Sequence, residues 1–188
     1  MDSSPSSRLG KTTDCVDDFA SKDIPTLIKQ LSNSDSLIRM EARDILSCIG
    51  APALPELLKI LPDANTQLRW QIIKLLDNIK DPSTIPILLH ELKDENAELR
   101  WAASNALINL RRELILPLLE ALTHDFDSLW FRQSAHHILR VLKDNGKLTP
   151  AEEEVCKALE GIEPTITVPW AAIKALQELK KNKNNPQQ

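Results

Sequence analysis

Regularly spaced arginines, and the large side chains that follow them, are the residues of this sequence best suited to binding chemistry. Arginine ends the pairs Ile38-Arg39, Leu68-Arg69, Leu99-Arg100 and Phe131-Arg132, at intervals of 30, 31 and 32 residues. The next position, with its counterpart in a fifth segment, holds Met40, Trp70, Trp101, Gln133 and Trp170. Exposed aromatic residues of this kind are typical of protein-binding surfaces, whereas a row of arginines alone would suit phosphate.

We expect no metal site, because the histidines and cysteines lack the spacing of ligands. His136 and His137 are adjacent, and neighbouring side chains on a helix point about 100° apart, so together they cannot chelate one ion. Cys156 falls in a different predicted helix, and the three cysteines show no CxxC spacing, which suggests reduced thiols. The sequence contains no Gly-x-Ser-x-Gly and only four glycines. We therefore expect neither catalytic residues nor a cofactor.

The composition predicts a soluble, helical, cytoplasmic protein. The 188 residues are 42% hydrophobic and 27% charged, as in ordinary globular proteins. A net charge of −4 gives no electrostatic reason to expect binding to nucleic acid or to an anionic membrane. No apolar stretch reaches the roughly 18 residues that a membrane span needs, and the first twenty residues show no signal peptide.

Two anchors that share one period predict a repeat of two helices. Pro25, Pro55, Pro86 and Pro117 are 30, 31 and 31 residues apart, and each is followed by apolar residues at helical spacing. Proline suits the opening turn of this first helix. The second helix is expected to open at a capping Asx residue, namely Asp35, Asn65, Asn96 or Asp127. The residues three, six, seven and ten positions after the arginine are apolar and form the inward side of this second helix. The position directly after the arginine therefore faces outward.

A fifth, degenerate copy closes the predicted array. The segment from Arg100 to Leu110 aligns with that from Pro169 to Leu179 through one tryptophan, three alanines and two leucines. Thr149 is expected to cap the first helix of this copy and Pro150 to open it. The predicted organisation is one repeat domain over residues 21–181, between disordered tails at 1–20 and 182–188, with units of about 21–50, 51–81, 82–111, 112–143 and 149–181.

The repeat contains three consecutive patterns, namely Ile/Leu-Pro-x-Leu-Leu-x-x-Leu, Asp-x-Asn-x-x-Leu-Arg-Trp and Ala-x-x-Ala-Leu-x-x-Leu. Together they resemble the HEAT repeat, in the short form of bacterial phycobilisome-lyase-type proteins. The resemblance implies an all-α, right-handed α-solenoid of about five helix pairs, with the second helices lining a concave face. It also implies a structural ladder in which arginines pair with acidic or Asx residues of adjacent repeats. The residues concerned are Asn33, Asp63, Asp94, Asp125, Arg39, Arg69, Arg100 and Arg132.

On the concave face of such a solenoid we expect an apolar centre with a charged border, which is the usual anatomy of a protein interface. Its residues are Met40, Trp70, Trp101, Trp170, Ile73, Lys74, Asn105, Ile108, His137 and Arg140. This surface predicts a non-enzymatic scaffold or adaptor for a protein partner, in which each tryptophan contributes on the order of 2–4 kcal/mol. Pairing with another solenoid stays open. The competing interpretation is that each indole only packs against the neighbouring repeat.

Two enzymatic alternatives follow from the resemblance. A bilin lyase or phycobilisome-handling factor would hold a tetrapyrrole on the aromatic row, with its propionates on Arg43, Lys74 or Arg140. An alkylated-DNA glycosylase of the HEAT-like kind would use the tryptophans and Asp77 as its acid. The acidic charge and the missing basic stripe argue against the glycosylase.

Overall fold

The computed structural model describes residues 23–184, which form ten α-helices and three short 3-10 helices, with no strand among them. The predicted all-α, solenoid-type fold of helix pairs is confirmed. The described chain divides into two compact units, and the division falls after Leu75. Among these residues, no single helix has the length and apolarity to cross a membrane. The segments 36–49 and 51–63, which meet at a bend of 112°, together have the length and apolarity of a membrane span, on length and composition alone.

The first unit contains the helices α2 (Ile24–Gln30), α3 (Ser36–Ile49), α4 (Leu54–Ile60) and most of α5 (Thr66–Ile79). Helix α2 packs against both α3 and α4. The apolar positions predicted from the period face inward, and the side chains of Leu31, Leu46 and Leu57 are completely buried. The helical spacing of these residues therefore builds the core of the unit, as expected for an amphipathic pair.

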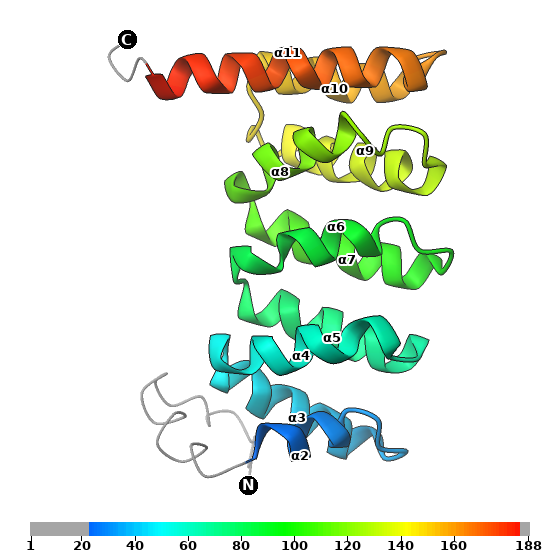
Figure 1. Cartoon of the computed structure of the whole chain (residues 1–188), viewed down its shortest axis with the longest axis vertical. Coiled ribbons are helices and arrows are strands. Elements are labelled where there is room, and N and C mark those ends of the chain that lie inside the picture. Colours follow the sequence, from blue (N-terminus) through cyan, green and yellow to red (C-terminus); the bar gives the residue numbers. More distant parts are fainter. Residues whose placement is uncertain (1–22, 185–188) are drawn as a thin grey trace, which may run out of the picture. The chain divides into compact units, whose positions relative to one another are not determined.

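The second unit contains α6 (Ile85–Glu91), α7 (Ala97–Leu110), α8 (Arg112–Leu122), α9 (Leu129–Asp144), α10 (Pro150–Glu160) and α11 (Pro164–Asn184). Two layers are visible in Figure 1: α6, α8 and α11 form one, and α7, α9 and α10 form the other. The core between them is closed by completely buried side chains such as Leu107, Leu118 and Phe131.

The last helix pair is reversed relative to the sequence prediction. The period predicts that α10 joins the layer of first helices and α11 that of second helices. Instead α10 packs against α9, and α11 packs against α8 (Figure 1). A five-residue connection, 145–149, separates α9 from α10, whereas Arg111 alone separates α7 from α8. The longer connection lets the chain return within the same layer before it crosses over.

Helix ends largely follow the predicted caps. Asp35 and Asn96 accept hydrogen bonds from backbone N–H groups of the first turn, and Thr149 forms a capping box with Glu152. The predicted start at Asp127 is wrong, because Ser128 is the cap of α9 and its hydroxyl accepts from the N–H of Phe131.

Two predicted boundaries also differ. Pro117 was expected in an opening turn but lies inside α8, which begins at Arg112. Helix α11 runs to Asn184, three residues into the predicted C-terminal tail. The predicted N-terminal tail and residues 185–188 lie outside the described residues.

The repeated arginines hold the turn within their own helix pair. Nη1 of Arg39 donates to the carbonyl of Asn33 at 2.7 Å, and Nη1 of Arg100 donates to that of Asp94 at 2.8 Å. Arg132 donates to the carbonyl six residues before it in the same way. These bonds support a structural role for the arginines. The acceptors, however, are backbone carbonyls of the same helix pair, whereas the expected ladder uses side chains of the adjacent pair. The arginines satisfy carbonyls of the turn between the two helices, which belong to neither helix.

The Asx residues of the expected ladder have other roles. Oδ1 of Asn33 accepts from the N–H of Asp35, and Oδ1 of Asp94 from that of Asn96, so both form a local turn before the second helix. Asp125 contacts the preceding helix pair, because Lys93 Nζ lies 2.7 Å from its Oδ1.

A left-handed backbone recurs eleven residues after the arginine. Gly50, Lys80 and Arg111 have φ angles of 70°, 55° and 53°. At Arg111, ψ is −116°, a combination that favours glycine over residues with a Cβ. We expect Arg111→Gly to raise the free energy of unfolding by about 1 kcal/mol, because the relieved strain exceeds the added entropy of the unfolded chain. Chemical denaturation measures the change. The control is Arg111→Ala, which removes the charged side chain but keeps the Cβ. If Arg111→Gly is less stable than Arg111→Ala, the prediction is wrong.

Candidate protein-binding surface

Two exposed tryptophans lie where α7 and α9 begin, and we call this group, with Arg100 and Leu129, the α7–α9 surface. Trp101 is 59% exposed, Leu129 52% and Trp130 39%. The guanidinium carbon of Arg100 lies 4.2 Å from the centroid of the Trp130 ring, a close cation–π contact. Trp101 follows Arg100 directly on α7. The surface therefore joins consecutive helix pairs through an aromatic and an arginine.

Local structure fixes these side chains in place. Arg100 donates through Nη1 to the carbonyls of Asp94 and Glu95 while its guanidinium covers Trp130, so its plane is held from two sides. In the run from Leu129 to Phe131, only Phe131 is buried, which leaves its two predecessors at the surface. Asn105 donates from its amide to the carbonyl of Trp101, one turn earlier on α7. The side chains of Arg100 and Trp130 are thus held together before any partner binds.

The predicted concave residues have different environments. On α7, Asn105 and Ile108 are half-buried, and on α9, His137 and Arg140 are exposed. In the first unit, Met40 is 47% exposed and Trp70 is half-buried. The predicted proximity of Trp70 and Trp101 stays a prediction.

Two of the predicted concave residues are misplaced. Ile73 is completely buried and belongs to the core, because it lies on the inward side of α5. Trp170 is 72% exposed, but it lies on α11, in the layer of α6 and α8 and not in that of α7 and α9. The reversed last pair is the cause.

Two of the three basic side chains that a bilin lyase would use to bind the propionates already interact with other residues of this chain. Arg43 donates to Oε1 of Gln71 at 3.1 Å within the first unit, and Lys74 is half-buried with interactions of its own. Arg140 is exposed on α9.

Sequence reasoning missed Trp130. It lies two positions before Arg132, and the equivalent positions before the other arginines hold Leu37, Gln67 and Glu98. Leu37 is also exposed. A search for large side chains at this second outward position of the repeat would have found it.

A second exposed apolar group lies on α11, and we call it the α11 stripe. Its members Ile166, Trp170 and Ile173 follow the i, i+4, i+7 spacing of one helix face, and Ile162 precedes them. The opposite face of α11 is buried through Val168, Ala172 and Ala175. The stripe and the α7–α9 surface belong to different layers.

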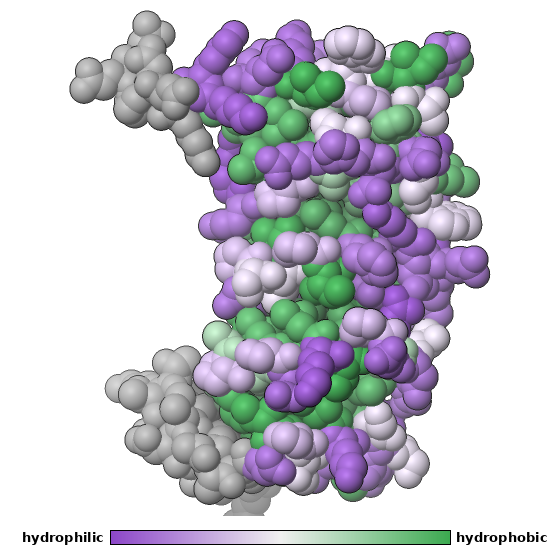
Figure 2. Space-filling view, in the orientation of Figure 1, coloured by the Kyte–Doolittle hydropathy of each residue, from purple (hydrophilic) through white to green (hydrophobic). Residues whose placement is uncertain are grey.

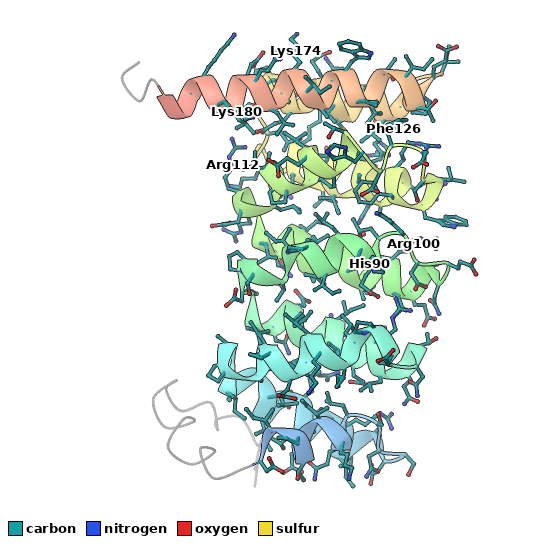
Figure 3. All side chains as sticks on the ribbon, in the orientation of Figure 1. His90, Arg100, Arg112, Phe126, Lys174 and Lys180 are labelled. Carbon is teal, nitrogen blue, oxygen red and sulfur yellow. The ribbon has the colours of Figure 1, made fainter. Side chains whose placement is uncertain are left out.

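A groove separates α8 and α11 in the layer that faces the viewer. Its cavity of about 520 Å³ has apolar walls from Ile115, Leu116 and Leu179. Arg112 and Lys180 lie at one end of these two helices (Figure 3). Figure 2, in the same orientation, shows hydrophobic residues exposed between hydrophilic ones along this face.

The structure brings together residues that the sequence prediction kept apart. His136 on α9 lies next to Cys156 and Glu160 on α10, and Nε2 of His136 is 2.9 Å from Oε1 of Glu160. Cys156 is in a different helix from the histidines, as expected, but it lies beside one of them, because the reversed pair places α10 against α9.

Residues 54–140 match the family model for HEAT repeats. The match supports the HEAT resemblance inferred from the sequence and covers the helices from α4 to most of α9. The match does not show whether the repeats belong to the short phycobilisome-lyase-type form or to another form of HEAT repeat. No curated protein matches the chain. HEAT repeats commonly mediate protein–protein interaction and are typically non-catalytic.

Proposed function

We propose that this protein is a non-enzymatic protein-binding module and that its α7–α9 surface holds the partner. The observation that carries the proposal is the pair of exposed tryptophans, Trp101 and Trp130, with Arg100 stacked on one of them. Tryptophan and arginine are the residues most enriched among those that dominate binding energy in protein interfaces. The HEAT match of the same helices supports this kind of function.

The geometry favours binding over a purely structural role for Trp101. A tryptophan that only filled a gap between repeats would be buried, yet 59% of its surface is exposed. Trp130 combines both roles, because one side of its ring contacts Arg100 and 39% of the residue stays accessible. Preformed side chains lose little conformational entropy when a partner binds, which increases affinity. We extend the surface along α7 and α9 through Ile108, His137 and Arg140, which lie two to three turns further along the same helices.

We expect Trp101→Ala to weaken partner binding by about 2 kcal/mol, which is roughly thirtyfold in Kd, and Trp130→Ala to have a similar effect. The partner is first captured from an extract of the native cell with the full chain, then purified and titrated by calorimetry. Gln133→Ala is the matched control, because Gln133 is exposed on α9 and follows the repeat arginine as Trp101 does. It should change the affinity less than about threefold.

Circular dichroism separates the two interpretations of the indoles. Both tryptophan variants are expected to keep the helical signal of the wild type. A loss of helix in Trp101→Ala would show that the ring is structural, and unchanged affinity in both folded variants would refute the proposal.

A further inference from the structure

Three potential metal ligands converge between α9 and α10. His136 comes from α9, and Cys156 and Glu160 come from α10, where a spacing of four residues puts them on one face. One ligand atom from each of the three lies within 4.8 Å of the other two. Each side chain supplies a different donor, namely nitrogen, sulfur or oxygen. This grouping is independent of the α7–α9 surface.

The cluster has a buried base and an open mouth. Cys156 is 1% exposed, whereas the side chains of His136 and Glu160 are 28% and 56% exposed. An ion could therefore enter past the imidazole and carboxylate and reach the thiol beneath them. The hydrogen bond of 2.9 Å between His136 and Glu160 already orients both groups toward this opening.

We propose that His136, Cys156 and Glu160 form a binding site for a divalent transition-metal ion of the zinc class. Zinc accepts histidine nitrogen, cysteine sulfur and carboxylate oxygen together, and a site with three protein ligands leaves a fourth position for water. Thiolate and carboxylate carry two negative charges, which balance the charge of the ion. Magnesium and calcium are disfavoured, because both prefer oxygen ligands alone.

The geometry needs only small shifts to close around an ion. Three atoms within 4.8 Å of one another can share a centre at most about 2.8 Å from each. Zinc bonds are about 2.0–2.3 Å long, so a side-chain movement of roughly half an ångström suffices. The exposed Glu160 side chain can rotate to supply most of it. The ion takes the place of the proton between Nε2 of His136 and Oε1 of Glu160, and this proton moves through solvent to Nδ1, so that the imidazole binds the ion in its neutral form.

Binding also displaces the thiol proton of Cys156, which passes to solvent. Burial raises the pKa of this thiol above its ordinary value, and the nearby Glu160 adds to the effect. A bound cation reverses this preference, because it stabilises the thiolate directly. Around the thiol, Lys143 and Arg140 of α9 also favour the thiolate, whereas Asp144 of the same helix opposes it.

The test is a titration of the full reduced chain with Zn²⁺ alone and, separately, with Co²⁺ alone. Calorimetry should show one site per chain, and Co²⁺ should give a thiolate-to-cobalt charge-transfer absorption. We expect Cys156→Ala and His136→Gln each to weaken Zn²⁺ binding at least about a hundredfold, the upper end of what losing even an outer-shell partner costs. The cobalt absorption should vanish in Cys156→Ala.

Matched controls change residues of the same types as the proposed ligands. His137→Gln changes the exposed neighbour of His136, and the double variant Cys15→Ser/Cys48→Ser removes the other two cysteines. Both are expected to keep the wild-type affinity.

Glu160→Gln keeps the proposal testable if replacement of the buried cysteine unfolds the unit, because this side chain is mostly exposed. It should also weaken binding while the helical signal is unchanged. Absence of a Zn²⁺ site in the wild type, or binding that survives in folded Cys156→Ala and Glu160→Gln variants, would overturn the proposal. Neither result would affect the proposed protein-binding function, which rests on other residues.

Discussion

Phe131→Ala is expected to lower the free energy of unfolding of the second unit by about 3–5 kcal/mol. Phe131 is completely buried between the layers and is among the largest enclosed side chains of the described residues. Lys93 Nζ lies 5.7 Å from its ring centroid while also pairing with Asp125, so the ring supports a contact between neighbouring helix pairs. Removal of the ring leaves a cavity that the packed helices fill poorly. The free-energy cost of this cavity adds to the loss of buried apolar surface.

Leu129, two positions before Phe131, gives a matched control for this change. Leu129→Ala removes an apolar side chain from the same turn of α9, but one that is half-exposed. It should cost less than about 1 kcal/mol, because little buried surface is lost. Urea denaturation followed by circular dichroism measures both variants. Equal losses for Phe131→Ala and Leu129→Ala would contradict the assignment of inward and outward sides of α9.

Arg112→Ala is expected to lower the free energy of unfolding by about 2–3 kcal/mol. Glu152 is completely buried, and Nη1 of Arg112 lies 2.7 Å and 2.8 Å from its two carboxylate oxygens. Without the arginine, the carboxylate keeps one hydrogen bond, in which the backbone N–H of Thr149 donates to Oε2 at 2.8 Å. The cost stays below that of a fully enclosed pair, because Arg112 is half-exposed and water can approach from its side.

A double-mutant cycle isolates this pair. Because one nitrogen of Arg112 makes both contacts, Arg112→Lys should lose less than Arg112→Ala. In the Glu152→Gln background, Arg112→Ala should cost at least about 1 kcal/mol less than in the wild type. Additive losses in thermal and chemical denaturation would show that the ion pair between α8 and α10 does not stabilise the unit.

The period of the sequence predicted the helix pairs well, because their core is set by local spacing. Inward residues such as Leu46 and Leu107 could be identified from their distance to the repeat arginine, and both are completely buried. The HEAT resemblance rested on the same spacing and is supported by the match over residues 54–140. Cap positions were also predictable, since Asp35 and Asn96 act through their own first turn.

Features that depend on contacts between distant residues could not be predicted in this way. The alignment of Trp170 with Trp101 is real in sequence, but packing of α11 on α8 puts Trp170 in the other layer. Cys156 meets His136 only because α10 packs on α9. The start of α8 at Arg112 coincides with a salt bridge to Glu152, forty residues later. Periodicity within a helix carries no information on any of these pairings.

Photo-cross-linking tests the central claim, that the α7–α9 surface holds the partner, most directly. A photoreactive phenylalanine analogue is introduced in place of Trp101, Trp130 or Trp170 in the full chain, one position at a time. All three side chains are exposed, so the analogue is tolerated and accessible at each. Irradiation of the complex should join the partner to positions 101 and 130 and leave position 170, on the other layer, largely unreacted. Cross-linking at 170 with none at 101 and 130 would contradict the account.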